Sequence, residues 1–515
     1  MNRKSLWVLP FLLLGSTPLI LQCSSAGRQS PPQTVDSPET LPDSLPFEFT
    51  REDVGEPVSP EEVSAFTWRI VEAWRRADFF HYLQGIVYGV PRNNPQGMPY
   101  YSVYWSGVAP YKEGDLVTFR HLEGGSAENI MIPNPVLLTN VIAAYKFAGD
   151  ERLALLADEL ARGVSAQFMG CVWDRGVSAE DRHVMARAVI NNNFEAVRAD
   201  GRRYAADYSA WRILDMRRWN TWFINIPNNP YWGDVYIQNM RSKDDVCHLF
   251  RAGGLLPHFL NLFPDPEVRA GVSGAFHDLA AFAKDITDHG FRIRSVDLDG
   301  NIWIPGIDLA SFVFYGQQSE CDAVLAARLL GYGDPGEIDC GNGISSLYET
   351  VATSTHTYNY NIIRNFHMAA LLASLNHRYD EVALRLMEGL AERSTSEMGK
   401  TEGTFADPGE QENFNGDLAG NLAKYAACGL PLTSREVRHL HRYYDEAAEV
   451  WNSWGEWNLW DASVPDGRHA YTPGTRVDFQ DMTAFLQLCA SPFVNDAGAA
   501  AVDCEIIRDA ANWGY

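Results

Sequence analysis

One short stretch of the chain contains the residue types needed to move a proton next to a sugar carboxylate. The stretch THTYNYNIIRNFH carries His356, Tyr358, Asn361 and Arg364 within nine positions. A Tyr or His can remove a proton from carbon, and Asn, His or Arg can neutralise the adjacent carboxylate so that a carbanion forms. The pattern therefore indicates β-elimination or C5-epimerisation of a uronic acid. Tyr358 or His356 is predicted to transfer the proton, and Asn361 and Arg364 are predicted to bind substrate.

A second set of residues could hydrolyse a glycosidic bond instead. Hydrolysis requires two carboxylates that flank the bond, and their separation sets the stereochemistry. The candidates are Asp245, Glu412, Asp417 and Asp481. Asp245 and Asp417 are predicted catalytic residues in this alternative. In the stretch RSKDDVCHLFR, His248 and Arg251 follow Asp245 and are predicted to bind substrate.

Aromatic residues are interleaved with polar ones in two stretches, WNTWFINIPNNPYWGDVY and WNSWGEWNLWD. The C–H faces of a sugar ring stack on aromatic rings, and its hydroxyls need polar partners. Trp232 and Trp457 are therefore predicted to contact a glycan. The alternative is that these aromatic side chains pack long loops onto the rest of the protein, since aromatic residues bury large areas.

Pairs of apolar helices joined by tight turns must position these residues. Each turn is short and is flanked by apolar residues at helical spacing. The turns fall at Gly149-Asp150, Pro264-Asp265-Pro266, Gly331–Asp334, Asn376–Tyr379, Gly429-Leu430-Pro431 and Ser491-Pro492. Longer connections join one pair to the next. Because loops on a rigid scaffold usually carry function, a site is expected at the end with the long connections.

Several helix ends carry local signals. Pro60 is placed to begin a helix, Asp150 to cap one and Pro266 to lie near the start of another. The segment FRIRSVDLDGNIWIP alternates around Asp299-Gly300 and predicts a β-hairpin. It imitates the beginning of a calcium loop but lacks the later Glu, so neither a metal nor another cofactor is predicted.

About six such helical pairs over residues 60–515 resemble the (α/α)6 toroid of carbohydrate-active enzymes, a group that includes polysaccharide lyases, glycoside hydrolases and sugar epimerases. The predicted fold is all-α, with long loops and a small β-hairpin, over residues 51–515. The set around Tyr358 resembles the Asn/His/Tyr/Arg sets of toroid lyases. The resemblance implies an enzyme acting on a glycan. The alternatives are an open helical solenoid for the fold and a non-catalytic glycan- or protein-binding module for the function.

The N-terminus resembles a bacterial lipoprotein signal. Residues 1–22 contain Arg3, Lys4 and an apolar run, and Cys23 follows as the predicted lipidated residue, although Gln22 replaces the usual small residue before it. Residues 23–50 are rich in Pro, Ser and acidic side chains and predict a disordered tether. The expected location is the cell envelope, at the outer membrane or periplasmic face. An ordinary secretory signal is the alternative.

Charge and cysteine content narrow the partners and the compartment. The formal net charge is −24, which argues against nucleic acid as a partner because phosphate binding needs clustered Lys and Arg. The chain has eight cysteines. Cys321 with Cys340, and Cys489 with Cys504, are close enough in sequence for local disulfides, which the periplasm permits. Burial as small apolar residues is the alternative for most of the cysteines.

Overall fold

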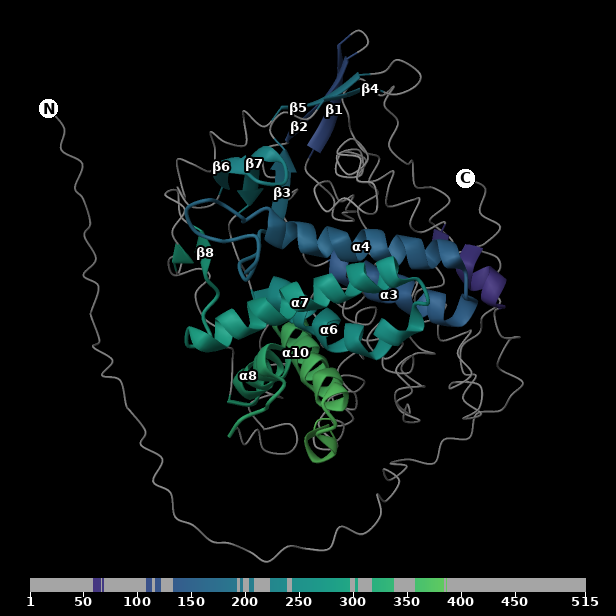
Figure 1. The fold of residues 1–515 in the computed structure, drawn as a ribbon, viewed down its shortest axis with the longest axis vertical. Helices are drawn as coiled ribbons and strands as arrows, with labels where there is room; N and C mark the ends of the chain where they lie inside the picture. Colours follow the sequence, from purple (N-terminus) through teal and green to yellow (C-terminus); the bar gives the residue numbers. More distant parts are fainter. Residues whose placement is uncertain are drawn as a thin grey trace, which may run out of the picture. The chain divides into compact units, whose positions relative to one another are not determined.

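Most of the residues that the structure describes are helical, which confirms the prediction of a predominantly helical protein (Figure 1). The structure is a computed structural model. All described residues belong to one compact unit of the chain, Ser44–Tyr515. The described residues are 59–65, 67–68, 108–113, 116–121, 133–191, 195–197, 203–207, 223–238, 243–296, 302–303, 317–337, 357–383 and 386.

The first helical pair is α3 (Pro133–Ala148) and α4 (Glu151–Met169). Gly149 ends α3 with a φ of +65°, a left-handed conformation that glycine adopts without steric cost. Asp150 then caps α4, since its carboxylate accepts a hydrogen bond from the backbone N–H of Arg152 at 3.0 Å. The turn and the cap are both as predicted.

The second pair is α6 (Lys243–Phe259) and α7 (Pro266–Asp288), joined through the short 3-10 helix η2 (Leu260–Leu262). Asp265 caps α7 by accepting from the N–H of Glu267 at 2.8 Å. Pro266 occupies the first turn, where its missing N–H has no intrahelical partner to lose. The predicted helix start at Pro266 is confirmed.

Two further helices are α8 (Gln317–Tyr332) and α10 (Thr357–Asn376). The end of α8 coincides with the predicted break, where Gly333 has a φ of +68°. Residues 377–379 interrupt the helical conformation after α10, and it resumes at residue 380. Residues 60–65 and 67–68 are also helical, in agreement with a start at Pro60. The predicted breaks near Gly429 and Ser491 lie outside the described residues.

These six helices form two rows of three. One row is α3, α6 and α10, in which α6 packs against both neighbours. The other row is α4, α7 and α8, in which α7 is the middle member. The contacts α3–α4, α6–α7 and α8–α10 join the two rows (Figure 1). Each helix therefore has neighbours within its row and across it, and the seams between rows are buried.

Neighbouring helices in each row run in the same direction. In the first row, contacts join Arg251 to Asn365 and His258 to the carbonyl of Leu372, each pair 114 residues apart. In the second row, the rings of Phe168 in α4 and Phe282 in α7 lie 5.9 Å apart and are also 114 residues apart. The α3–α4 and α6–α7 pairs are thus equivalent units placed side by side.

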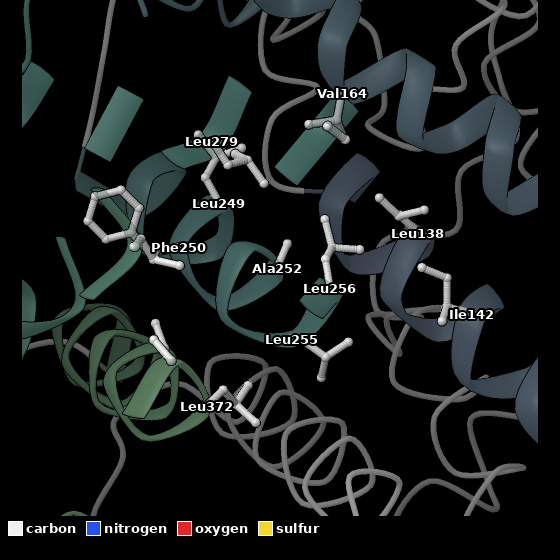
Figure 2. Packing of buried hydrophobic residues seen from close by; sticks show 14 of the residues in the cluster. Leu138, Ile142, Val164, Leu249, Phe250, Ala252, Leu255, Leu256, Leu279 and Leu372 are labelled. Carbon is white, nitrogen blue, oxygen red and sulfur yellow. The ribbon is translucent and has the colours of Figure 1, made fainter. Parts of the chain in front are cut away.

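The core of this array is apolar and centred on α6. The ring of Phe250 lies 6.4 Å from that of Phe282 in α7 and 5.8 Å from that of Phe366 in α10, both in edge-to-face geometry. Figure 2 shows Leu256 of α6 on the side of α3 and Leu255 on the side of α10. Apolar contacts on three sides of α6 therefore fix its position between the neighbouring helices.

In the part of the chain that the structure describes, the strands form three small sheets. They are β1 (Val108–Glu113), β2 (Leu116–His121), β5 (Arg203–Asp207) and β4 (Glu195–Val197) in the first, in that order; β3 (Ala188–Asn191), β7 (Gly233–Gln238) and β6 (Phe223–Asn229) in the second; and β8 (Ser295–Val296) with β9 (Ile302–Trp303) in the third. All pairs are antiparallel except β2 with β5. The pair β8–β9 is the predicted hairpin. The two larger sheets were not predicted.

The second sheet has its own apolar core. Side chains at alternate positions of β6 and β7 are buried, as the period of a strand requires. They pack with residues that follow α4 and with one residue of β8. The cluster contains Cys171, Val172, Trp173, Val177, Val184, Ala186, Val189, Ile224, Ile226, Val235, Ile237 and Val296. At Gly170 a Cβ atom would lie only 2.2 Å from a methyl group of Val189, so glycine permits the close approach of β3 to the end of α4.

Candidate functional site

The predicted site residues on α6 and α10 lie at the same end of the helical array. Arg251 of α6 contacts Asn365 of α10, and His258 of α6 contacts the carbonyl of Leu372, so the two helices run in the same direction. Both helices therefore begin at the same end of the array. Convergence of these polar residues on one cleft stays a prediction.

Arg251 is the best-defined of the predicted substrate-binding residues. Its side chain is buried, and its Nη1 donates a hydrogen bond to Oδ1 of Asn365 at 2.6 Å. A hydrogen bond from a charged donor is stronger than one between neutral groups. This contact ties α6 to α10 one turn beyond the position of Asn361. Asn365 was not predicted, because nothing in the local sequence distinguishes it from the other Asn residues of the stretch.

Asp245 lies in the first turn of α6 and is completely buried. One of its carboxylate oxygens lies 2.9 Å from Nε of Arg187, which is itself 7% exposed. Burial of both charges removes their hydration, so each depends on its partner. Arg187 was missed by sequence reasoning. The available signal was an Arg inside the otherwise apolar run that leads into β3.

His248 and Trp232 have contrasting positions. His248 is half-buried and lies one turn after Asp245 on α6. Trp232 lies in the turn between β6 and β7, where its backbone N–H donates to Oδ1 of Asn229 at 3.1 Å and its side chain packs against the core of the second sheet. Its observed contacts are those of an aromatic residue that packs a turn. Contact of Trp232 with a glycan stays a prediction.

Asn229 is a buried organising residue that sequence reasoning did not identify. Its side-chain amide nitrogen lies within hydrogen-bond distance of the carbonyls of Met169, Gly170 and Val172, at 2.8, 3.3 and 3.1 Å. The last carbonyls of a helix need such partners because they have no intrahelical donor. Asn229 therefore fastens the β6–β7 turn to the C-terminal end of α4.

A basic segment, residues 182–187, faces three buried carboxylates of α6 and α7. Besides the contact of Arg187 with Asp245, Arg182 donates to both oxygens of Asp278 at 3.0 and 3.1 Å. His183 Nε2 lies 3.8 Å from Asp285, whose carboxylate also accepts from Arg294. These contacts hold the segment against the two helices.

Burial has a large effect on the pKa of Asp278, the carboxyl group that pairs with Arg182 of the basic segment. Burial raises the pKa of this carboxyl group to about 6, although Arg182 and the hydroxyl of Ser165 both act to lower it. Desolvation of the charged form therefore outweighs the bidentate ion pair. The group is still ionised and paired with Arg182 at neutral pH.

His367 of α10 is a core residue. It is 2% exposed, and its Nδ1 lies 2.8 Å from Asp322 in α8 while its Nε2 lies 2.5 Å from the carbonyl of Leu386. Cys321, next to Asp322, is disulfide-bonded, which agrees with the predicted use of this cysteine; its partner lies outside the described residues. Cys171 and Cys247 are buried, in agreement with the alternative that cysteines serve as small apolar core residues.

Several predicted site residues lie outside the described part of the chain. His356, Asp417, Trp457 and Cys23 lie outside the described residues, as do the side chains of Tyr358, Asn361 and Arg364 on the described backbone of α10. Among the side chains that the structure describes, no group of three or more His, Cys, Asp or Glu could hold a metal ion. In the same part of the chain, no helix has the length and apolar character needed to cross a membrane.

Comparison of the chain with protein-family models, with curated proteins and with solved structures finds no match. The geometry of α6 and α10 is the structural basis for a function. That geometry consists of two parallel helix starts, two buried polar contacts that fix them, and a histidine on α6 beside them.

Proposed function

We propose that the protein is an extracytoplasmic carbohydrate-active enzyme whose site lies where α6 and α10 begin. The observation that carries this proposal is the common direction and register of the two helices, defined by the Arg251–Asn365 and His258–Leu372 contacts. In our proposal, this arrangement brings His248 and Arg251 close to Tyr358, Asn361 and Arg364. Proton transfer next to a neutralised carboxylate needs these residue types close together.

The environment of Asp245 favours elimination or epimerisation over hydrolysis. An acid that protonates a leaving group must contact the substrate. The carboxylate of Asp245 is fully buried and paired with Arg187, so it is poorly placed for that contact. In our proposal Tyr358 or His356 takes the C5 proton of a uronic acid, and Asn361 and Arg364 neutralise its carboxylate. In elimination the bond between C4 and the glycosidic oxygen then breaks as the C4–C5 double bond forms, and the leaving oxygen takes a proton from one of the same two side chains; in epimerisation a proton returns to the other face of C5. Asp245 has a structural role through its contact with Arg187. Asp417 stays the candidate carboxylate for the hydrolase alternative.

We also propose that the helical pairs close into an α/α toroid. The equal offsets of 114 residues between α4 and α7 and between α6 and α10 support a repeating arrangement. The helical pairs predicted around the breaks at Gly429 and Ser491 would supply the remaining pairs. An open solenoid built from the same pairs is the alternative.

The proposed location is the cell envelope. The lipoprotein-like signal ending at Cys23 supports attachment through a lipid, and the tether that follows would hold the enzyme away from the membrane surface. The disulfide at Cys321 supports an oxidising compartment, where such bonds form and persist.

The test is product analysis with the full-length protein on a panel of uronic-acid polymers, including alginate and polygalacturonate, and on neutral glucans. Elimination creates a carbon–carbon double bond that absorbs ultraviolet light. Hydrolysis creates saturated reducing ends, and epimerisation changes sugar configuration without cutting the chain. We expect new double bonds from a uronic-acid polymer only. Saturated ends would favour the hydrolase alternative.

The second candidate is a lipid-anchored module that binds a glycan or protein without turning it over. The structural contacts of Arg251 and Asp245 favour it, because both side chains are engaged within the protein. Saturable binding of a polymer from the panel, with no change to that polymer over long incubation, would support the module and contradict the enzyme.

A further inference from the structure

We infer that Arg187 is a positioning residue that fixes the start of α6 for the proposed site. The inference rests on the proposed function for its catalytic consequence, but its structural part can be measured separately. Arg187 belongs to the basic segment, residues 182–187, which comes just before β3. It therefore links the second sheet to the helix end at which the predicted site residues gather.

The contact between Arg187 and Asp245 is short and buried. Nε of Arg187 lies 2.9 Å from the Asp245 carboxylate, and the two side chains are 8% and 0% exposed. A buried ion pair depends strongly on both partners, because removal of one leaves the other charge desolvated. Either single substitution should therefore disturb the first turn of α6, where Asp245 lies.

A second ion pair of the basic segment, Arg182 with Asp278, serves as a control. It allows an effect on the position of α6 to be separated from an effect on the stability of the whole protein. Arg182 pairs with buried Asp278 as Arg187 pairs with buried Asp245. Asp278, however, belongs to α7, and its neighbour Ser165 belongs to α4. The Arg182 contact thus supports the second row of helices, whereas the Arg187 contact supports the start of α6 beside α10.

The position of Arg187 also connects two predicted parts of the site. The sheet order β3-β7-β6 places the strand that follows Arg187 next to β7, and the β6–β7 turn carries Trp232. A shift of Arg187 would move the sheet and the start of α6 relative to each other. Arg187 acts on substrate only through such placement, so it is a positioning residue and not a catalytic one.

The experiment compares Arg187→Met, Asp245→Asn and the double variant with the control Arg182→Met, all in the full chain. Hydrogen exchange is followed in peptides covering residues 243–250 and 272–282, together with melting temperature and turnover of alginate and polygalacturonate. We expect Arg187→Met to speed exchange in 243–250 at least tenfold and to lower kcat more than it changes KM. Arg182→Met should speed exchange in 272–282 only.

The double variant separates positioning from a merely structural role. Removing both charges abolishes the buried unpaired charge, so its melting temperature should recover toward the wild type. Its kcat should stay low, because the link to α6 is still missing. Arg187→Lys retains a charge and should recover part of the activity; it also serves if Arg187→Met does not fold.

The outcomes distinguish this inference from the proposed function. Equal exchange in 243–250 for Arg187→Met and Arg182→Met, or recovery of kcat together with melting temperature in the double variant, would overturn the positioning role. A wild type that is inert on every polymer would overturn the proposed function. Selective exchange in 243–250 would then still support Arg187 as the residue that fixes the start of α6.

Discussion

The helical array and the sheet that packs at the end of α4 are held together in different ways. Inside the array, α6 is fixed by apolar contacts such as those of Phe250 with Phe282 and Phe366. In contrast, buried polar contacts of Asn229, Arg182 and Arg187 join the sheet and the basic segment to the helices. Apolar packing tolerates changes of solvent and pH, whereas a buried polar contact depends on one particular partner and its charge. The proposed site lies where the two kinds of packing meet.

The largest expected effect is at the apolar centre. Phe250→Ala would remove a fully buried ring and leave a cavity between α6, α7 and α10, so we expect a loss of about 3–5 kcal/mol in the free energy of unfolding. Denaturant unfolding measures this loss. The conservative control Phe250→Leu should lose much less. A loss below about 1 kcal/mol for Phe250→Ala would show that this centre does not hold the array together.

The next effect is a pH dependence at the polar boundary. The pKa of Asp278 is raised to about 6 in the folded state, above its ordinary value of 3.8, so the folded protein holds a proton that the unfolded chain has lost. The stability that this proton provides is present below about pH 4 and disappears as pH rises through 6. The expected size is about 2–4 kcal/mol.

The measurement is the free energy of unfolding across this range for the wild type and for Asp278→Asn. The substitution should remove the downward slope attributable to this group between pH 4 and 6. An identical slope in both proteins would mean that another group is responsible, and that burial of Asp278 does not control its protonation.

A smaller effect is expected at the turn that fastens the second sheet. Asn229→Ala would remove the amide that serves the carbonyls at the end of α4, and we expect a loss of about 1–3 kcal/mol. Hydrogen exchange should rise in β6 and β7 and stay unchanged in α10. A uniform rise over both regions would indicate that the sheet and the helices unfold as one unit.

The smallest effect concerns a cap within the array. Asp150→Ala removes the N-cap of α4 and should cost about 1 kcal/mol. Hydrogen bonding to Arg152 lowers the pKa of Asp150 to about 2, below its ordinary value of 3.8. The contribution of the cap is therefore present above pH 4 and is lost as pH falls through 2, the opposite direction to Asp278. Asp150→Asn, which keeps an oxygen acceptor, is the control in thermal unfolding.

The sequence was most informative where structure depends on neighbouring residues. Gly149, Asp150 and Pro266 act within one turn of a helix, and Asp299-Gly300 marks the hairpin β8–β9, so each could be recognised locally. The alternation of Ile224, Ile226, Val235 and Ile237 also marked β6 and β7, but the aromatic residues around it drew the prediction toward a ligand-binding loop.

The supports of the candidate site could not be found in the same way. Arg251 and Asn365 are 114 residues apart in the sequence. The three strands of the second sheet lie between Arg187 and Asp245 in the sequence, although the two side chains are in contact. Such pairs are created by the packing of helices and strands, which a single sequence does not specify locally. The common direction of α6 and α10 could be predicted from the order of the helices, whereas the partner of each polar side chain could not.

The most direct test of the central claim is the rate at which the full-length protein forms double bonds in a uronic-acid polymer when Tyr358 is replaced by Phe. The matched control is Tyr360→Phe, two residues away on α10. Our account predicts a loss of about 10²–10⁴-fold in kcat for Tyr358→Phe, because the ring stays and only the proton-transferring hydroxyl is removed. Melting temperatures should be unchanged, and Tyr360→Phe should be near the wild type. Equal rates for the wild type and Tyr358→Phe would contradict the role of Tyr358 in proton transfer and leave that role to His356.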